Sequence, residues 1–137
     1  MRCGTTLRVF GKAFDARAFA KRHKMKTQHL WNRGESPVPA LPPLDNGGFM
    51  LRVSDAVDTF EQMEDAARFL RRHRAKLVAL GDIDKVEEVW LEVTFPMHGA
   101  KRVTAFMVPR LVVGLAAELG IKLVIIAVPR DMARLKR

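Results

Sequence analysis

The sequence predicts an α+β fold, with a mainly antiparallel sheet and helices packed on one face, broadly ferredoxin-like. Two observations carry this prediction. Residues 5–11, 48–55 and 85–96 alternate apolar and polar side chains, which is typical of strands with one face on a core and one toward water. Residues 58–82 have the 3.6-residue spacing of an amphipathic helix instead. Alternating strands that leave one face polar need helices on the other face only.

The first third of the chain holds a strand, a short helix and a loop. In the strand at 5–11, Leu7 and Val9 share the face opposite Phe10. The helix follows in "FDARAFAKRHK", with Asp15 as its N-cap. A brief strand is expected at 28–32. The following stretch, 36–48, has four prolines and two glycines, so we expect a surface loop that ends in the turn "DNGG".

The stretch 58–82 predicts one long helix. Asp58 or Thr59 can cap its start, and Gly81 stands where a helix commonly ends. Acidic residues gather in the first turns and basic residues toward the end, as the helix dipole favours. The expected core-facing stripe is Phe60, Met63, Ala67, Leu70 and Leu77.

The last third predicts a strand, a helix and a second strand. In 85–96, Trp90 and two glutamates alternate with apolar residues. Pro109 fits the first position of a helix that ends at Gly120 and is apolar around most of its circumference, so we expect it to be well buried. The stretch "IKLVIIAVP" (121–129) is apolar on both faces, which predicts an interior or covered strand.

The order of these elements resembles a bacterial family of small domains of unknown function. The residues that carry the resemblance are "LRVFG", "HLWNRGE", "GGFMLRVS", the long helix, and "FMVPRLVVGLAAELGIKLVIIAV". It spans about residues 6–128. The resemblance implies an α+β fold and no particular activity. The basic tail after Pro129 departs from the family pattern.

Composition limits the class of protein. The 137 residues predict a single domain, 1–137, with its core at about 6–128 and a basic tail at 130–137. The single cysteine, Cys3, cannot form an internal disulfide. The N-terminus "MRCGTTLRVF" has no apolar core of a signal peptide, and no apolar run is long enough for a membrane span, so we expect a cytoplasmic protein that does not enter a membrane.

Motifs of catalysis or cofactor binding are not found. The four histidines are scattered and Cys3 has no CxxC partner, so we expect no metal site. Phosphate-loop and dinucleotide glycine patterns and G-x-S-x-G are absent, and we expect no cofactor. Glu88 and Glu92, four residues apart on a strand, would stand about 13 Å apart, too far for a usual acid/base pair. An enzyme is therefore the less favoured interpretation.

The polar face of the sheet is the first candidate interaction surface. If the strands are neighbours, it presents Phe10, Met50, Arg52 and Trp90. Large apolar patches are rare on monomers, so a tryptophan on an uncovered sheet favours a homodimer contact or a ligand platform. The leading hypothesis is a non-catalytic binding or interaction module that self-associates through this open sheet or through an edge strand.

A second candidate is a pocket beneath the 36–48 loop. Trp31, Arg33 and Glu35 precede the loop and could line such a pocket, which is the form an enzyme would take. The simpler interpretation is structural: Trp31 packs at the edge of the core, Gly34 makes a turn, and Arg33 pairs with a carboxylate or stays in water.

The net charge of +9 raises a nucleic-acid alternative. Its contacts would come from the basic helix and the tail, and would be independent of nucleotide sequence and weakened by salt. Otherwise these residues form a solvated surface. The candidates are Arg68, Arg71, Arg72, Arg74, Lys76, Arg134, Lys136 and Arg137.

Overall fold

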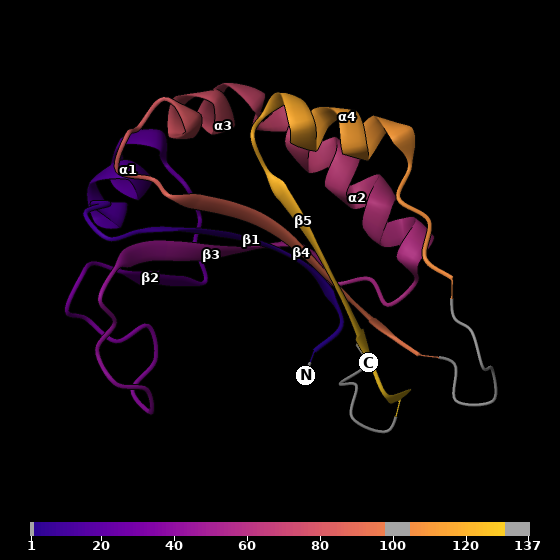
Figure 1. Ribbon diagram of the computed structural model, residues 1–137, viewed down its shortest axis with the longest axis horizontal. Coiled ribbons are helices and arrows are strands. Elements are labelled where there is room, and N and C mark those ends of the chain that lie inside the picture. The colour runs from indigo at the N-terminus through magenta and orange to yellow at the C-terminus, as the bar shows by residue number, and fades with distance from the viewer. Residues whose placement is uncertain (1, 98–104, 131–137) are drawn as a thin grey trace.

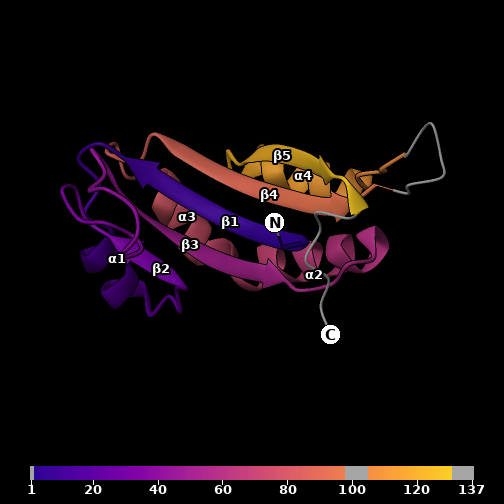
Figure 2. The ribbon, with the colours of Figure 1, turned by 90° about the horizontal axis from the view of Figure 1, so that it is seen from below.

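The protein forms one layer of strands with its helices on one side (Figures 1 and 2). The computed structural model describes residues 2–97 and 105–130. Within them lie a five-stranded sheet and four helices. Their bounds are β1 Gly4–Gly11, α1 Ala16–His23, β2 His29–Trp31, β3 Gly47–Ser54, α2 Thr59–Arg72, α3 Arg74–Gly81, β4 Glu88–Pro96, α4 Arg110–Glu118 and β5 Lys122–Val128.

The strand order is β2-β3-β1-β4-β5. β1 pairs antiparallel with both β3 and β4, and β2 pairs antiparallel with β3. β5 pairs parallel with β4, because α4 carries the chain back across the sheet between them. The predicted α+β fold with a mainly antiparallel sheet is confirmed. The closer likeness to ferredoxin-like proteins stays a prediction.

The core lies between the sheet and the helices. Leu7, Val9, Leu91 and Val93 are fully buried on the helix-facing side, as the alternation predicts. Phe49 is buried beside them. Their neighbours in sequence point to the opposite side of the sheet, because successive side chains of a strand alternate.

The predicted long helix is wrong in one respect, since it divides at His73 into α2 and α3. His73 has φ −104° and ψ 16°, outside the helical region. Backbone hydrogen bonds from His73 N to Phe69 O and from Leu77 N to His73 O, both 3.0 Å, continue through this point. The division is therefore a kink, and nothing in the local sequence explains it.

The predicted core stripe of this helix is wrong at its first residue. Phe60 is 69% exposed. The side of α2 that meets the sheet is centred on Gln62, Met63, Ala66 and Leu70 instead. Met63, Leu70 and Leu77 are buried as expected.

The burial expected for the last two elements is also wrong. α4 buries only Val112 and Ala116, and leaves Leu111 and Val113 more than two-fifths exposed. Pro109 is its N-cap and not its first helical residue. Within residues 2–97 and 105–130, β5 is an edge strand, since β4 is its one neighbour in the sheet. Apolar character on both faces thus does not place this strand in the interior.

Candidate functional site

The side of the sheet away from the helices gathers the predicted interaction residues. Arg8 of β1 stands opposite Met50 of β3 and opposite Trp90 of β4. Phe10, two residues along β1, lies on the same face. All four side chains are half-buried. The alternation of three strands and their register therefore bring these residues together, although they come from three separate stretches of the sequence.

One end of this face is hollowed. We call this cavity of about 470 Å³ the tryptophan hollow. The sheet supplies its floor and the proline-rich loop supplies a wall. Its lining residues are Arg8, Phe10, His29, Trp31, Pro37, Val38, Leu41, Leu44, Asn46, Met50 and Trp90. The structure thus joins two predicted sites, the open sheet and the space beneath the loop, into one.

Of the three residues predicted for the pocket, only Trp31 lines it. The Trp31 side chain is almost wholly buried, and its indole N–H donates to Asn46 Oδ1 at 2.9 Å. Arg33 pairs with Asp45 at 2.8 Å outside the hollow. Glu35 pairs with Arg17 at 2.7 Å, and hydrogen bonding from Arg17 holds the pKa of Glu35 below its usual value. The last two residues therefore fasten the start of the loop.

Sequence reasoning missed the apolar residues within the loop. Val38, Leu41 and Leu44 alternate with prolines and line the hollow. Apolar residues that recur in a proline-rich loop indicate that the loop packs against the rest of the protein. This pattern in the sequence could have predicted the wall of the hollow. Ser36 helps to shape the loop by donating from Oγ to the carbonyl oxygen of Leu41 at 2.6 Å.

Arg8 lines the hollow, and the hydrogen bonds of its guanidinium group are weak or incomplete. Its Nη2 donates to Glu92 Oε1 at 3.3 Å. Its Nε lies 2.9 Å from Glu92 Oε2, but the geometry does not make a hydrogen bond, and this buried N–H has no acceptor in the described part of the chain. Its Nη1 lies 3.4 Å from the Met50 sulfur, which is a weak acceptor.

Arg52, the remaining predicted surface residue, has structural contacts. It donates to Thr6 Oγ1 at 3.0 Å, to Asp55 Oδ1 at 3.0 Å, and to the carbonyl oxygen of Cys3. It lines a second, more polar cavity on the same face, which shares Arg8, His29 and Met50 with the tryptophan hollow. Arg52 therefore ties the N-terminal strand to β3.

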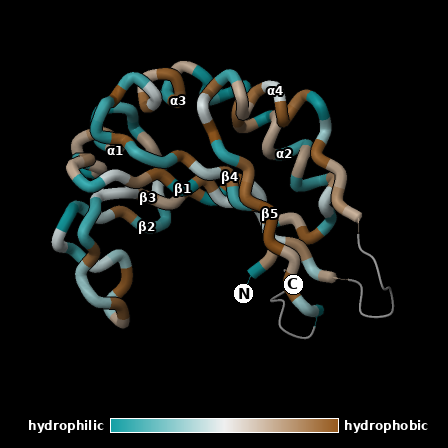
Figure 3. The backbone as a smooth tube through the Cα atoms, viewed as in Figure 1, coloured by the Kyte–Doolittle hydropathy of each residue, from teal (hydrophilic) through white to brown (hydrophobic). Residues whose placement is uncertain are grey.

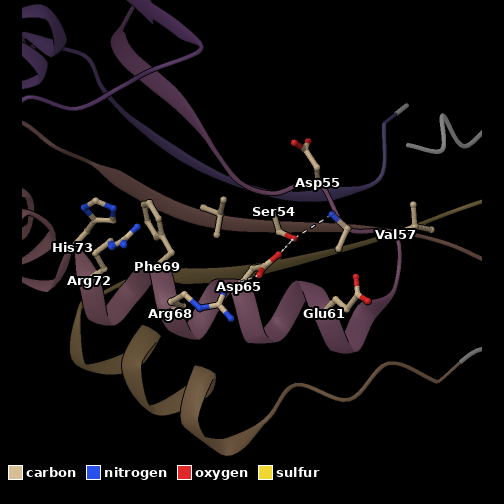
Figure 4. Close-up of a pocket in the computed structure, with 11 residues that line it drawn as sticks. Ser54, Asp55, Val57, Glu61, Asp65, Arg68, Phe69, Arg72 and His73 are labelled. Carbon is tan, nitrogen blue, oxygen red and sulfur yellow. Dashed lines mark hydrogen bonds and ion pairs between the residues drawn. The ribbon is translucent and has the colours of Figure 1, made fainter. Parts of the chain in front are cut away.

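A charged cleft of about 540 Å³ lies on the helix side, between the end of β3 and α2 (Figure 4). Ser54 Oγ donates to Asp65 Oδ2 at 2.6 Å, and Arg68 pairs with the same carboxylate at 3.0 Å. His73 lies at the far end of the cleft, beyond Phe69 (Figure 4). Ser54 consequently has no histidine beside it, and its hydroxyl donates to the Asp65 carboxylate instead.

The predicted polyanion contacts are interleaved with acidic groups. Arg68 pairs with Asp65, and Arg74 forms an ion pair with Glu118. Arg71 and Arg72 are exposed and Lys76 is half-buried. The kink at His73 divides the basic run between two helices. Arg134, Lys136 and Arg137 lie outside the described residues.

Residues 2–97 and 105–130 contain no cluster of three metal-ligating side chains. Over the same residues, no helix has both the length and the apolar character of a membrane span. Cys3 is buried, and burial raises the pKa of its thiol.

Comparison with family models, with curated proteins and with solved structures found no match to this chain. The resemblance to a bacterial family of small α+β domains therefore stays a prediction.

Proposed function

We propose that the protein is a non-catalytic interaction module that forms a symmetric homodimer through the outer edge of β5. The observation that carries the proposal is the character of this edge. β5 is the last strand in the sheet order, and apolar residues follow one another along nearly its whole length (Figure 3). Because successive side chains alternate, both of its faces are apolar. Its central residue, Ile125, is 41% exposed. An edge strand of this kind offers unpaired backbone groups and apolar side chains together.

The two edges of the sheet differ in how open they are. β2, at the other edge, has only three residues, and short edge strands resist pairing. β5 has seven residues with neither proline nor an inward-pointing charge. Its one charged side chain, Lys122, stands at its start, where Nζ lies 2.7 Å from the Glu88 carboxylate. The short length of β2 therefore disfavours pairing with a strand of a second copy, whereas β5 has none of these features that oppose pairing.

The open sheet face supports a dimer less well than this edge. The Arg8–Glu92 ion pair lies across its middle, and burying such a pair under a second copy costs desolvation. The apolar end of the face is walled by the loop. At the β5 end, in contrast, no ion pair crosses the middle of the strand among the described residues, and α4, which contacts β5, exposes the apolar side chains of Leu111 and Val113.

The proposal is tested by the mass of the protein in solution. We expect sedimentation velocity to give twice 15.5 kDa for the natural chain at micromolar concentration. Ile125→Lys places a charge on this edge strand, and we expect this variant to be monomeric. Val78→Lys is the matched control, since Val78 is an apolar residue of similar exposure on α3. A natural chain that stays monomeric at about 1 mM, or an Ile125→Lys chain that stays dimeric, overturns the proposal.

Cross-linking tests the position of the axis. Two copies of β5 related by a two-fold axis perpendicular to the sheet run antiparallel. In a register centred on Ile125, the two copies of this residue have Cα atoms about 5 Å apart, and the copies of Lys122 about 20 Å apart. In a Cys3→Ser background, Ile125→Cys should form an intermolecular disulfide and Lys122→Cys should not. A disulfide at position 122 and none at position 125 would show that the dimer contact is not centred on Ile125.

A further inference from the structure

We propose that the tryptophan hollow binds a small molecule with a flat apolar body and one carboxylate, and that Arg8 receives the carboxylate. This site goes beyond the proposed dimer and is independent of it. The hollow spans β2 to β4 on the open face, and no residue of β5 lines it.

The walls of the hollow fit a flat apolar body. Phe10 and Trp90 meet on its floor with ring centroids 5.3 Å apart, and Leu41 lines it from the loop. The Trp31 indole N–H is bonded to Asn46 and the Trp90 indole N–H to Glu88. Because both N–H groups are engaged, the indoles offer the hollow apolar ring surface. A volume of about 470 Å³ is that of a small-molecule site.

The charge of the lining favours an anion. Arg8 and His29 are the ionisable residues among those that line the hollow, and none of the lining residues is acidic. Two carboxylates stand just outside. Glu92 pairs with Arg8 itself, and Glu88 pairs with Lys122. The hollow therefore offers a ligand the Arg8 guanidinium and the His29 imidazole, and no carboxylate lines it.

Arg8 identifies where the carboxylate lies. One side of its guanidinium, Nε and Nη2, faces Glu92, whereas Nη1 is directed at the Met50 thioether. A carboxylate makes charge-assisted hydrogen bonds that are far stronger than those to sulfur. A ligand carboxylate beside Met50 would replace the weak acceptor with a strong one, while the apolar body of the ligand lies over the Phe10 and Trp90 rings.

A matched pair of compounds tests the proposal. Naphthalene-2-carboxylate and 2-naphthylmethanol share a flat body and differ in the charged head. The chain has only two tryptophans, and both line the hollow, so its ¹H–¹⁵N spectrum gives two indole signals that report on the site directly. We expect the carboxylate to shift both signals with one dissociation constant, and the alcohol to bind about tenfold more weakly.

Three variants locate the head group. Arg8→Gln should weaken binding of the carboxylate about tenfold and leave binding of the alcohol unchanged. Glu92→Gln removes the competing carboxylate and should tighten binding of naphthalene-2-carboxylate. Arg33→Gln is the control, because Arg33 is a nearby cation that does not line the hollow. We expect this variant to bind both compounds as the natural chain does.

The outcomes separate this inference from the dimer. Equal binding of the two compounds, or no shift of the indole signals at about 10 mM ligand, overturns the inference. If both compounds bind only to dimeric protein, a second copy completes the site, and the assignment to one chain is wrong. Binding that persists unchanged in Ile125→Lys supports the site whatever the mass measurement shows.

Discussion

Phe10 and Trp90 pack edge to face across the open side of the sheet, with ring centroids 5.3 Å apart and an interplanar angle of 76°. They lie on adjacent strands, and Trp90 stands directly opposite Arg8, two residues before Phe10. The contact is therefore a diagonal cross-strand pair, which long aromatic side chains can reach. This pair makes up much of the floor of the tryptophan hollow.

The pair should be energetically coupled. We expect a double-mutant cycle with Phe10→Leu and Trp90→Leu to give a coupling free energy of about 1 kcal/mol, as edge-to-face aromatic pairs do. Urea denaturation of the four chains measures it. A parallel cycle with Phe60→Leu, which changes an exposed phenylalanine on α2, should give no coupling with Trp90→Leu. Equal values in the two cycles would contradict the prediction.

Gln62 should be the most sensitive polar residue of α2. It is fully buried, accepts from Thr5 Oγ1 at 2.8 Å, and donates to the carbonyl oxygen of Thr94 at 3.1 Å. Gln62→Leu keeps the volume and leaves the Thr5 hydroxyl without this acceptor. We expect a loss of about 1–3 kcal/mol in the free energy of unfolding. Glu64→Leu, an exposed change on the same helix, should alter it by less than about 0.5 kcal/mol.

Glu88 should titrate below its ordinary pKa of 4.5. Hydrogen bonds from Lys122 and then from Trp90 stabilise the carboxylate and lower the pKa. The stabilisation is present above the unfolded pKa and is lost as the pH falls through the folded one. The carboxyl ¹³C shift of Glu88 measures this, with the Trp90 indole signal as a second reporter. Lys122→Met should raise the midpoint, and Lys85→Met, a change in the turn before β4, should not.

The Cys3 thiol should react slowly with disulfide reagents. Its side chain is 2% exposed, and burial raises its pKa from the ordinary 9.0, against smaller effects of the N-terminus and Arg52. At pH 8 the folded chain should react with a disulfide reagent at least about tenfold more slowly than the chain in guanidinium. A cysteine introduced at exposed Val78 should react at the rate of a free thiol. Equal rates at the two positions would show that Cys3 is accessible.

The sequence by itself determined the strands and their faces. In β1 and β4 the alternation of apolar and polar residues gave the buried side correctly at Leu7, Val9, Leu91 and Val93. It did so because an alternating strand has one way to bury its apolar face. Asp15 was likewise predictable as an N-cap, since it accepts from Ala18 N at 3.1 Å. These are local properties of the chain.

Only the tertiary structure decided the positions of those elements whose hydrophobic pattern is compatible with more than one place in the fold. β5 and α4 are apolar on more than one side, so their sequences agree equally with an interior position and with an edge. The parallel crossover places β5 at the edge. The tryptophan hollow was decided in the same way, because Trp31, Leu41 and Trp90 belong to three separate segments. Each segment carries its own residues, but only the strand order and the fold of the loop bring them to one cavity.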